Sequence, residues 1–216
     1  LEGWTLSTDG GEIALQGRLD TRSEAYGIEL RCDSFPLNSF LPADSLGLLD
    51  LALQAGGSGF DPLRAQTRGN IRLQVDRAEF RGRDFGGVKL NANLEGGQLS
   101  GRLSDRDEAL RLLLLISGTL TERKQEVRLT GNVFDFDLAE LGISPQKIGG
   151  SFALEAGASA SDAGSYTARI ALDSIEVRTR HRTDRIRPTS LSLSSDTTAT
   201  RAKLASGDLS LAFVSP

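Results

Sequence analysis

Hydrophobic and polar residues alternate along most of this chain. In the segment 25–34, for example, Ile28, Leu30 and Cys32 are separated by charged residues. A period of two is typical of a β-strand with one apolar and one polar face. The pattern recurs about every ten residues, and it predicts an all-β fold.

Turn signals separate the predicted strands. Clusters of Gly and acidic residues, such as Asp9–Gly11 and Glu95–Gly97, stand between them. Connections this short permit only antiparallel neighbours, because a parallel pair needs a crossover of about a dozen residues. We therefore predict an up-and-down meander with strands at 3–8, 12–20, 25–34, 47–57, 64–76, 77–82, 86–95, 97–104, 109–120, 124–135, 148–157, 165–174, 175–182, 184–195, 199–206 and 207–215.

The alternation breaks at two places, 36–42 and 137–142. There the apolar residues recur at helical spacing, and Pro42 and Gly142 follow as stop signals. Asp137 stands where an N-cap is expected. We predict one short helical turn at each place.

The chain also contains an internal repeat. Between Phe35–Asp61 and the segment 101 positions later, Phe136–Asp162, eight of twenty-seven residues are identical without a gap. Such self-similarity indicates a stacked, elongated architecture. We therefore treat 1–216 as one continuous β-repeat body, in which 1–33 ends a preceding copy, 34–134 is one copy and 135–216 is part of another.

Composition limits the function classes. The net charge of -4 gives no reason to expect nucleic acid, whose binding needs concentrated positive charge. The single Cys32 cannot form an intrachain disulfide, and the absence of Met suggests a fragment of a longer protein. The longest apolar run, Leu112–Ile116, is far too short for a membrane-spanning helix, but being apolar at every position it should be covered on both faces.

Residue types suited to catalysis do not cluster in the sequence. His181 has no acidic partner nearby, Ser58 lies in a turn-like glycine segment, and Asp105 and Asp107 lack the spacing of a calcium loop. We expect no enzyme activity, no cofactor and no metal site. One cluster stays open: Arg178, Arg180, Arg182 and Arg185 form either a solvated hairpin tip or a rim that binds lipid phosphate.

A sheet with one apolar face must close on itself, on another layer or on a ligand. A sandwich or barrel would fill the face internally, and a parallel β-helix would need a much shorter repeat. The third possibility is a curled antiparallel sheet, a U-shaped trough whose inner wall is aliphatic and holds acyl chains. The residues predicted to line this groove are Leu15, Leu30, Leu53, Ile71, Leu73, Val75, Val88, Leu90, Leu94, Leu103, Leu114, Val127, Leu129, Leu154, Ile170, Leu172, Leu191 and Leu193.

The chain resembles the periplasmic part of the TamB (translocation and assembly module) family, which is related to AsmA-like proteins. The resemblance is carried by three segments, Phe35–Pro42, Gly59–Pro62 and Phe136–Gly142, and by the Leu-x-Gly-x-Leu rhythm at 15–19 and 116–120. The resemblance covers nearly the whole chain. It implies a long trough in the periplasm, part of an inner-membrane-anchored cell-envelope protein.

The function that the resemblance implies is a non-enzymatic bridge that conducts phospholipid or another amphipathic lipid between inner and outer membrane. The alternative is a scaffold that assists outer-membrane barrel assembly, with a barrel-assembly partner, by capturing strands at sheet edges. The same edges would let the fragment associate with itself.

Overall fold

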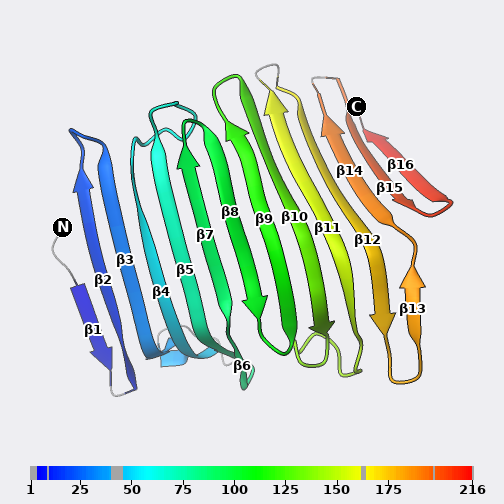
Figure 1. The fold of residues 1–216 in the computed structure, drawn as a ribbon, viewed down its shortest axis with the longest axis horizontal. Helices are drawn as coiled ribbons and strands as arrows, with labels where there is room; N and C mark the ends of the chain where they lie inside the picture. The colour runs from blue at the N-terminus through cyan, green and yellow to red at the C-terminus, as the bar shows by residue number, and fades with distance from the viewer. Residues whose placement is uncertain (1–3, 9, 40–45, 162–163, 197, 216) are drawn as a thin grey trace.

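The computed structural model describes residues 4–8, 10–39, 46–161, 164–196 and 198–215, which form one open antiparallel sheet of 16 strands (Figure 1). The strands follow one another across the sheet in chain order, apart from two short strands that pair beside the main path. The sheet does not close, since β1 and β16 are its opposite ends. The predicted all-β meander is confirmed.

The described residues up to Leu120 form nine strands and one 3-10 turn. They are β1 (Trp4–Thr8), β2 (Gly11–Asp20), β3 (Ala25–Pro36), η1 (Leu37–Ser39), β4 (Leu46–Ser58), β5 (Arg68–Phe80), β6 (Arg83–Phe85), β7 (Val88–Glu95), β8 (Gln98–Arg106) and β9 (Leu110–Leu120). The remaining strands are β10 (Lys124–Asp137), β11 (Gly149–Ser161), β12 (Tyr166–Arg178), β13 (Thr183–Ile186), β14 (Thr189–Ser195), β15 (Thr200–Ser206) and β16 (Leu209–Ser215).

Two predicted strand ends were wrong, because a β-bulge breaks the alternation without ending a strand. The segments 64–76 and 77–82 form the single strand β5, whose register against β4 shifts between Asp50 and Leu51. The segments 165–174 and 175–182 likewise form β12, with a shift between Ser151 and Ala153. A bulge adds one unpaired residue and bends the strand, so the pattern changes phase while pairing continues.

The predicted strand 184–195 divides into β13 and β14 at Arg187 and Pro188. Proline has no N–H to donate to the ladder, so the strand breaks there. β13 then pairs with the end of β12, as β6 pairs with the end of β5.

Both predicted helical turns fall at the lower end of the sheet in Figure 1. The first is η1, and the part of that prediction at 40–42 lies outside the described residues. The second is a hydrogen-bonded turn in which Asp137 Oδ1 accepts the Ala139 N–H at 2.9 Å. The Leu141 N–H donates to the Asp137 carbonyl at 2.9 Å, and Gly142 ends the turn with φ +70°. Neither continues into an α-helix, since each offers only a few residues of helical pattern.

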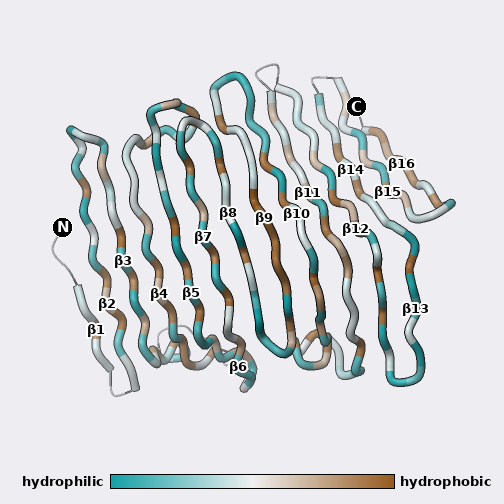
Figure 2. Tube along the Cα trace, viewed as in Figure 1, coloured by the Kyte–Doolittle hydropathy of each residue, from teal (hydrophilic) through white to brown (hydrophobic). Residues whose placement is uncertain are grey.

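Strand register places the apolar residues on one side of the sheet. Directly opposed residues in an antiparallel pair point to the same side, so a row of paired residues defines a face. The central row consists of Leu15, Leu30, Leu53, Leu73, Leu90, Leu103, Leu114, Gly131, Leu154 and Leu172. We call this side the apolar face. The other side, the polar face, has a neighbouring row that includes Gln16, Glu29, Gln54, Arg72, Asn91 and Arg102. Figure 2 shows the alternation along the strands.

No second layer covers the apolar face within the described part of the chain. Packing between elements runs from each strand to its neighbours in the sheet, and η1 packs only beside β4. Even so, Cys32, Phe35, Leu114 and Val133 are each at most 6% exposed. On an uncovered face such burial must come from neighbouring side chains, which approach one another where the face is concave. This pattern of buried side chains on an uncovered face is the one expected for a sheet that curls into a trough with an aliphatic inner wall.

The expectation that Leu112–Ile116 is covered on both faces was wrong. Leu115 lies on the polar face between Arg102 and Thr130, and it is 51% exposed. Leu114, the next residue on the opposite side, is 5% exposed. An apolar run alone therefore did not indicate a covering element, because nothing in the described chain packs over the polar side of β9.

The strand pattern recurs at the offset of the sequence repeat. The register shift between Cys32 and Phe35 in β3 returns between Val133 and Phe136 in β10, 101 positions later. The short strands β6 and β13 are related by a similar offset. The two copies can therefore be compared position by position.

A carboxylate at the lower end of the apolar face gives a pH-dependent prediction. Asp105 lies opposite Leu112, and desolvation raises the pKa of its carboxyl group, with a smaller contribution from the charge of Asp107. A raised pKa means that the folded state favours the neutral acid, so stability is lost as pH rises through the folded pKa. Asp105→Asn removes the charge and keeps the oxygen that accepts the Asp107 N–H at 2.9 Å. We expect a higher urea midpoint for the variant at pH 7 and no difference at pH 3; a gain of the same size at both pH values would contradict this.

Candidate functional site

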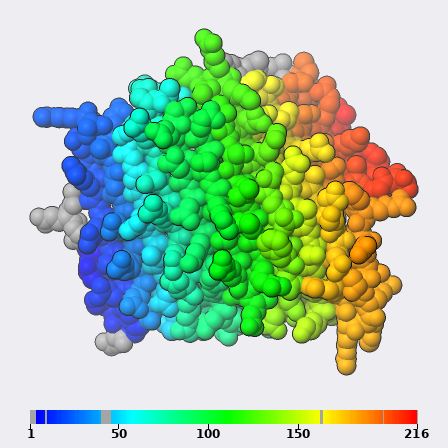
Figure 3. Space-filling view, viewed as in Figure 1, coloured from blue at the N-terminus to red at the C-terminus, as the bar shows by residue number. Residues whose placement is uncertain are grey.

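All the residues predicted to line the groove lie on the apolar face, as the register pairs show. They come from eleven strands between β2 and β14 that are neighbours in the sheet, rather than from one cluster. The space-filling view shows the strands as successive bands in chain order, with no distant segment lying across the visible face (Figure 3). Because the described strands form one open sheet and pack against their neighbours within it, the apolar face is a continuous surface rather than an enclosed core.

Large apolar residues on this face are exposed in both the first and the last strands of the sheet. Ile170, Leu191 and Leu193 are each between 46 and 47% exposed. A monomer rarely leaves so extended an apolar surface in contact with water unless the surface binds something. The large apolar residues that are exposed on this side include Leu15, Leu19, Ile28, Tyr166, Ile170, Leu191, Leu193, Leu211 and Phe213.

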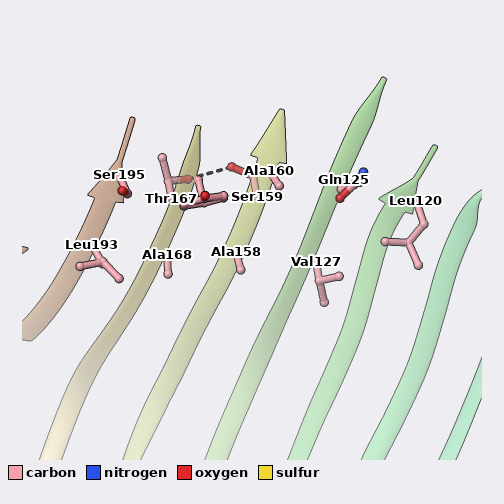
Figure 4. A pocket seen from close by; sticks show the side chains of 11 residues that line it. Leu120, Gln125, Val127, Ala158, Ser159, Ala160, Thr167, Ala168, Leu193 and Ser195 are labelled. Atoms are coloured by element: carbon pink, nitrogen blue, oxygen red, sulfur yellow. Dashed lines mark hydrogen bonds between the residues drawn. The ribbon is translucent and has the colours of Figure 1, made fainter. Parts of the chain in front are cut away.

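A groove of about 330 Å³ lies at the upper end of the apolar face (Figure 4). Its floor is formed by Ala158 and Ala168, which lie opposite each other in β11 and β12. Val127 and Leu193 stand on either side of them, and the lining is almost wholly apolar. Short side chains between longer ones make the depression. The remaining lining residues are Leu120, Gln125, Ser159, Ala160, Tyr166, Thr167 and Ser195.

One repeat earlier in the chain, the corresponding place is filled by an aromatic side chain. Tyr26 lies opposite Gly57, which lies opposite Gly69, as Val127, Ala158 and Ala168 do in the second copy. A Cβ on Gly57 or Gly69 would come within 2.7 or 3.1 Å of the Tyr26 hydroxyl oxygen, so the phenol side chain lies across both glycines.

Phe60 adds to this filling, since its ring centroid lies 6.4 Å from that of Tyr26. Sequence reasoning included Val127 but missed Tyr26, Ala158 and Ala168. The repeat offset holds a usable signal, because Tyr26 and Val127 are related by 101 positions. The chain thus has one filled and one open version of the same groove.

The predicted phosphate rim lies on the β12–β13 hairpin at the other end of the sheet. Arg178 forms an ion pair with Asp135, and Arg182 Nε lies 2.8 Å from Asp184 Oδ2. Arg178 also lies opposite Gly149, which puts it on the polar face. Arg180 and Arg185 form no ion pair with another described residue. The structure therefore separates these four arginines into two that are neutralised within the chain and two that are not.

Other residues considered for chemistry lie apart from the groove. His181 is exposed at the tip of the same hairpin, and Ser58 lies at the end of β4 rather than in a turn. Burial raises the pKa of the Cys32 thiol, which disfavours the reactive thiolate. Among the described residues no group of three His, Cys, Asp or Glu side chains is placed to hold a metal ion.

The described part of the chain contains no helix long and apolar enough to cross a membrane. Comparisons with protein-family models, with curated proteins and with solved structures found no match to this chain. The class that the fold defines is an open antiparallel β-sheet with an uncovered, concave apolar face. Function has to be inferred from that face.

Proposed function

We propose that the apolar face binds the acyl chains of phospholipid or another amphipathic lipid and conducts them along the trough, without catalysis. The observation that supports this is a continuous aliphatic surface left uncovered across the sheet. At about 25 cal/mol per Å² of apolar area, contact with hydrocarbon stabilises such a surface considerably. Because the residues predicted to line the groove are Leu, Ile and Val, their side chains offer packing without hydrogen-bond groups, which suits alkyl chains.

The resemblance to the TamB family extends the proposal to the location of the protein and to the two membranes that it would connect. A trough that spans the periplasm as part of an inner-membrane-anchored protein would carry lipid between inner and outer membrane. The groove residues would then be sections of a longer inner wall, with further copies of the repeat continuing it. These statements rest on the resemblance and on the shape of the sheet.

Two neighbouring residues of β7 offer a matched test. Leu90 lies in the central row, and Asn91 lies on the polar face between Arg72 and Arg102. We expect Leu90→Glu to abolish lipid association, because an unpaired carboxylate on the apolar face disfavours hydrocarbon contact. Asn91→Glu introduces the same group beside two arginines and should leave association unchanged. The measurement is the lipid carried by each purified variant, determined by native mass spectrometry.

Circular dichroism of both variants shows whether the strands are retained. If folded Leu90→Glu protein carries as much lipid as the parent and as Asn91→Glu, the proposal is wrong. Lipid-free parent protein that keeps its native shape would weigh against it equally.

A second function, strand capture during outer-membrane protein assembly, is favoured by the last strand. β16 pairs with β15 on one side, and every residue from Leu209 to Ser215 is exposed. An open edge offers unpaired N–H and C=O groups to an added strand. Substituting Ala212 of β16 by proline would impair strand capture and leave lipid association intact, whereas Leu90→Glu should do the reverse.

A further inference from the structure

A cavity at the lower end of the sheet lies among the β8–β9, β10–β11 and β12–β13 loops. It encloses about 860 Å³, within the range of small-molecule sites. Unlike the groove over Ala158 and Ala168, this cavity is lined by charged side chains of both signs. The lining residues are Glu108, Asp135, Phe136, Asp137, Glu140, Lys147, Gly149, Arg178, Thr179 and Arg180.

Several of these charges are already partnered within the chain. Asp135 pairs with Arg178 and also lies 3.1 Å from Arg111. Glu140 Oε2 lies 3.2 Å from Arg83. Asp137 accepts backbone N–H groups of the turn that follows it. These groups hold the loops around the cavity in place and leave little charge free for a ligand.

Three side chains of the cavity have no such partner. Among the described residues, Glu108, Lys147 and Arg180 form no ion pair and no side-chain hydrogen bond. Two cations and one carboxylate therefore line one cavity, brought together from three separate loops. A ligand that complements them has an anion for Lys147 and Arg180 and a cation for Glu108.

We infer that this cavity binds a phosphoethanolamine group, the head group of a zwitterionic phospholipid. A phosphodiester accepts hydrogen bonds from both ammonium and guanidinium donors. A primary ammonium has three N–H donors for a carboxylate, whereas a quaternary ammonium has none and prefers an aromatic cage. The cavity has one aromatic lining residue, Phe136, so its chemistry favours the primary amine.

Phe136 also connects the cavity to the apolar face. It lies opposite Leu110 and Gly150, and its ring centroid is 6.1 Å from that of Phe152. Phe152, Leu154 and Ala156 then continue the apolar face along β11. The charged residues Asp135, Asp137 and Arg178 line the cavity from the polar side, so the cavity lies at the strand ends, between the two sides of the sheet. The acyl chains of a lipid bound there would pass Phe136 to reach the apolar face. This inference rests on the proposed function, because the lipid rather than a free metabolite is taken as the source of the head group.

The test compares four soluble probes on the 216-residue chain by isothermal titration calorimetry. They are dihexanoylphosphatidylethanolamine, dihexanoylphosphatidylcholine, free phosphoethanolamine and dihexanoylglycerol. The parent should bind the ethanolamine lipid most tightly. We expect the parent to prefer the ethanolamine lipid over the choline lipid about fivefold in affinity, the upper range for one exposed ion pair. Glu108→Gln should remove this preference.

Lys147→Gln and Arg180→Gln should each weaken both phospholipids about fivefold and leave dihexanoylglycerol unchanged. Arg185→Gln is the matched control, since it removes the same charge from the same hairpin outside the cavity. Equal effects of Arg180→Gln and Arg185→Gln would overturn the site, and so would an unchanged ethanolamine preference in Glu108→Gln. If dihexanoylglycerol binds and the ethanolamine lipid binds no better, the head-group site fails while the proposed function stands. If free phosphoethanolamine binds as tightly as the lipid, the lipid source is wrong.

Discussion

Leu114→Ala is expected to lower the free energy of unfolding by about 2–4 kcal/mol, whereas Leu115→Ala should change it by no more than about 0.5 kcal/mol. The two leucines are adjacent in β9, but they point to opposite sides of the sheet. Leu114 is 5% exposed between Leu103 and Gly131 in the central row. Leu115 is 51% exposed on the polar face.

The comparison isolates burial from strand propensity, because both substitutions replace the same residue type in the same strand. Urea unfolding followed by circular dichroism gives both free energies. Equal losses would show that the two faces are buried alike, and the description of one concave, closely packed apolar side would then be wrong. A loss at Leu114 alone would show that the side chains of an open sheet stabilise it by packing among themselves.

The alternating pattern was sufficient to predict the fold and the membership of the apolar face. Since side chains alternate along a strand, a correct strand phase also assigns the face, and residues as distant as Leu15 and Leu193 were both placed on it. Errors in strand phase arose at bulges, in β5 where it passes Asp50 of β4 and in β12 where it passes Ser151 of β11. There an extra residue shifts the pattern while the strand continues.

Contacts between side chains of different strands were not predictable in this way. The pairing of Arg178 with Asp135 joins β12 to β10 and depends on register and on the bulge in β10. Likewise, Lys147, Glu108 and Arg180 line one cavity because their three loops lie at the same end of the sheet. Alternation gives the direction of a side chain but not its partner, so the charged cavity could be found only in three dimensions.

The difference between the two copies of the groove was hidden for another reason. No role was predicted for the glycines and alanines of the apolar face, although their small size is what makes the depression. Gly57 and Gly69 leave space that Tyr26 fills, whereas Ala158 and Ala168 leave space that Val127 does not reach. The repeat offset links Tyr26 to Val127 and Gly57 to Ala158, whereas Gly69 and Ala168 correspond only through strand register.

Val127→Phe is therefore expected to fill the open groove and weaken lipid binding there about tenfold. This corresponds to about two methylene groups losing their burial. Phenylalanine is preferable to tyrosine, because the Tyr26 hydroxyl lies 2.7 and 3.1 Å from the Cβ positions of its two glycines, where the second copy has alanine methyls. Titration of the chain with dihexanoylphosphatidylcholine measures the effect.

Tyr26→Val is the reciprocal variant, because it should open a second groove over Gly57 and Gly69 and increase the amount of lipid bound. It should also reduce stability by about 1 kcal/mol through loss of the aromatic contact with Phe60. If Val127→Phe binds lipid as well as the parent while Tyr26→Val gains none, the grooves do not hold acyl chains. Opposite shifts in the two variants would instead mean that residues 26 and 127 set how many chains each repeat can accept, because each either occupies or vacates the same place on the inner wall.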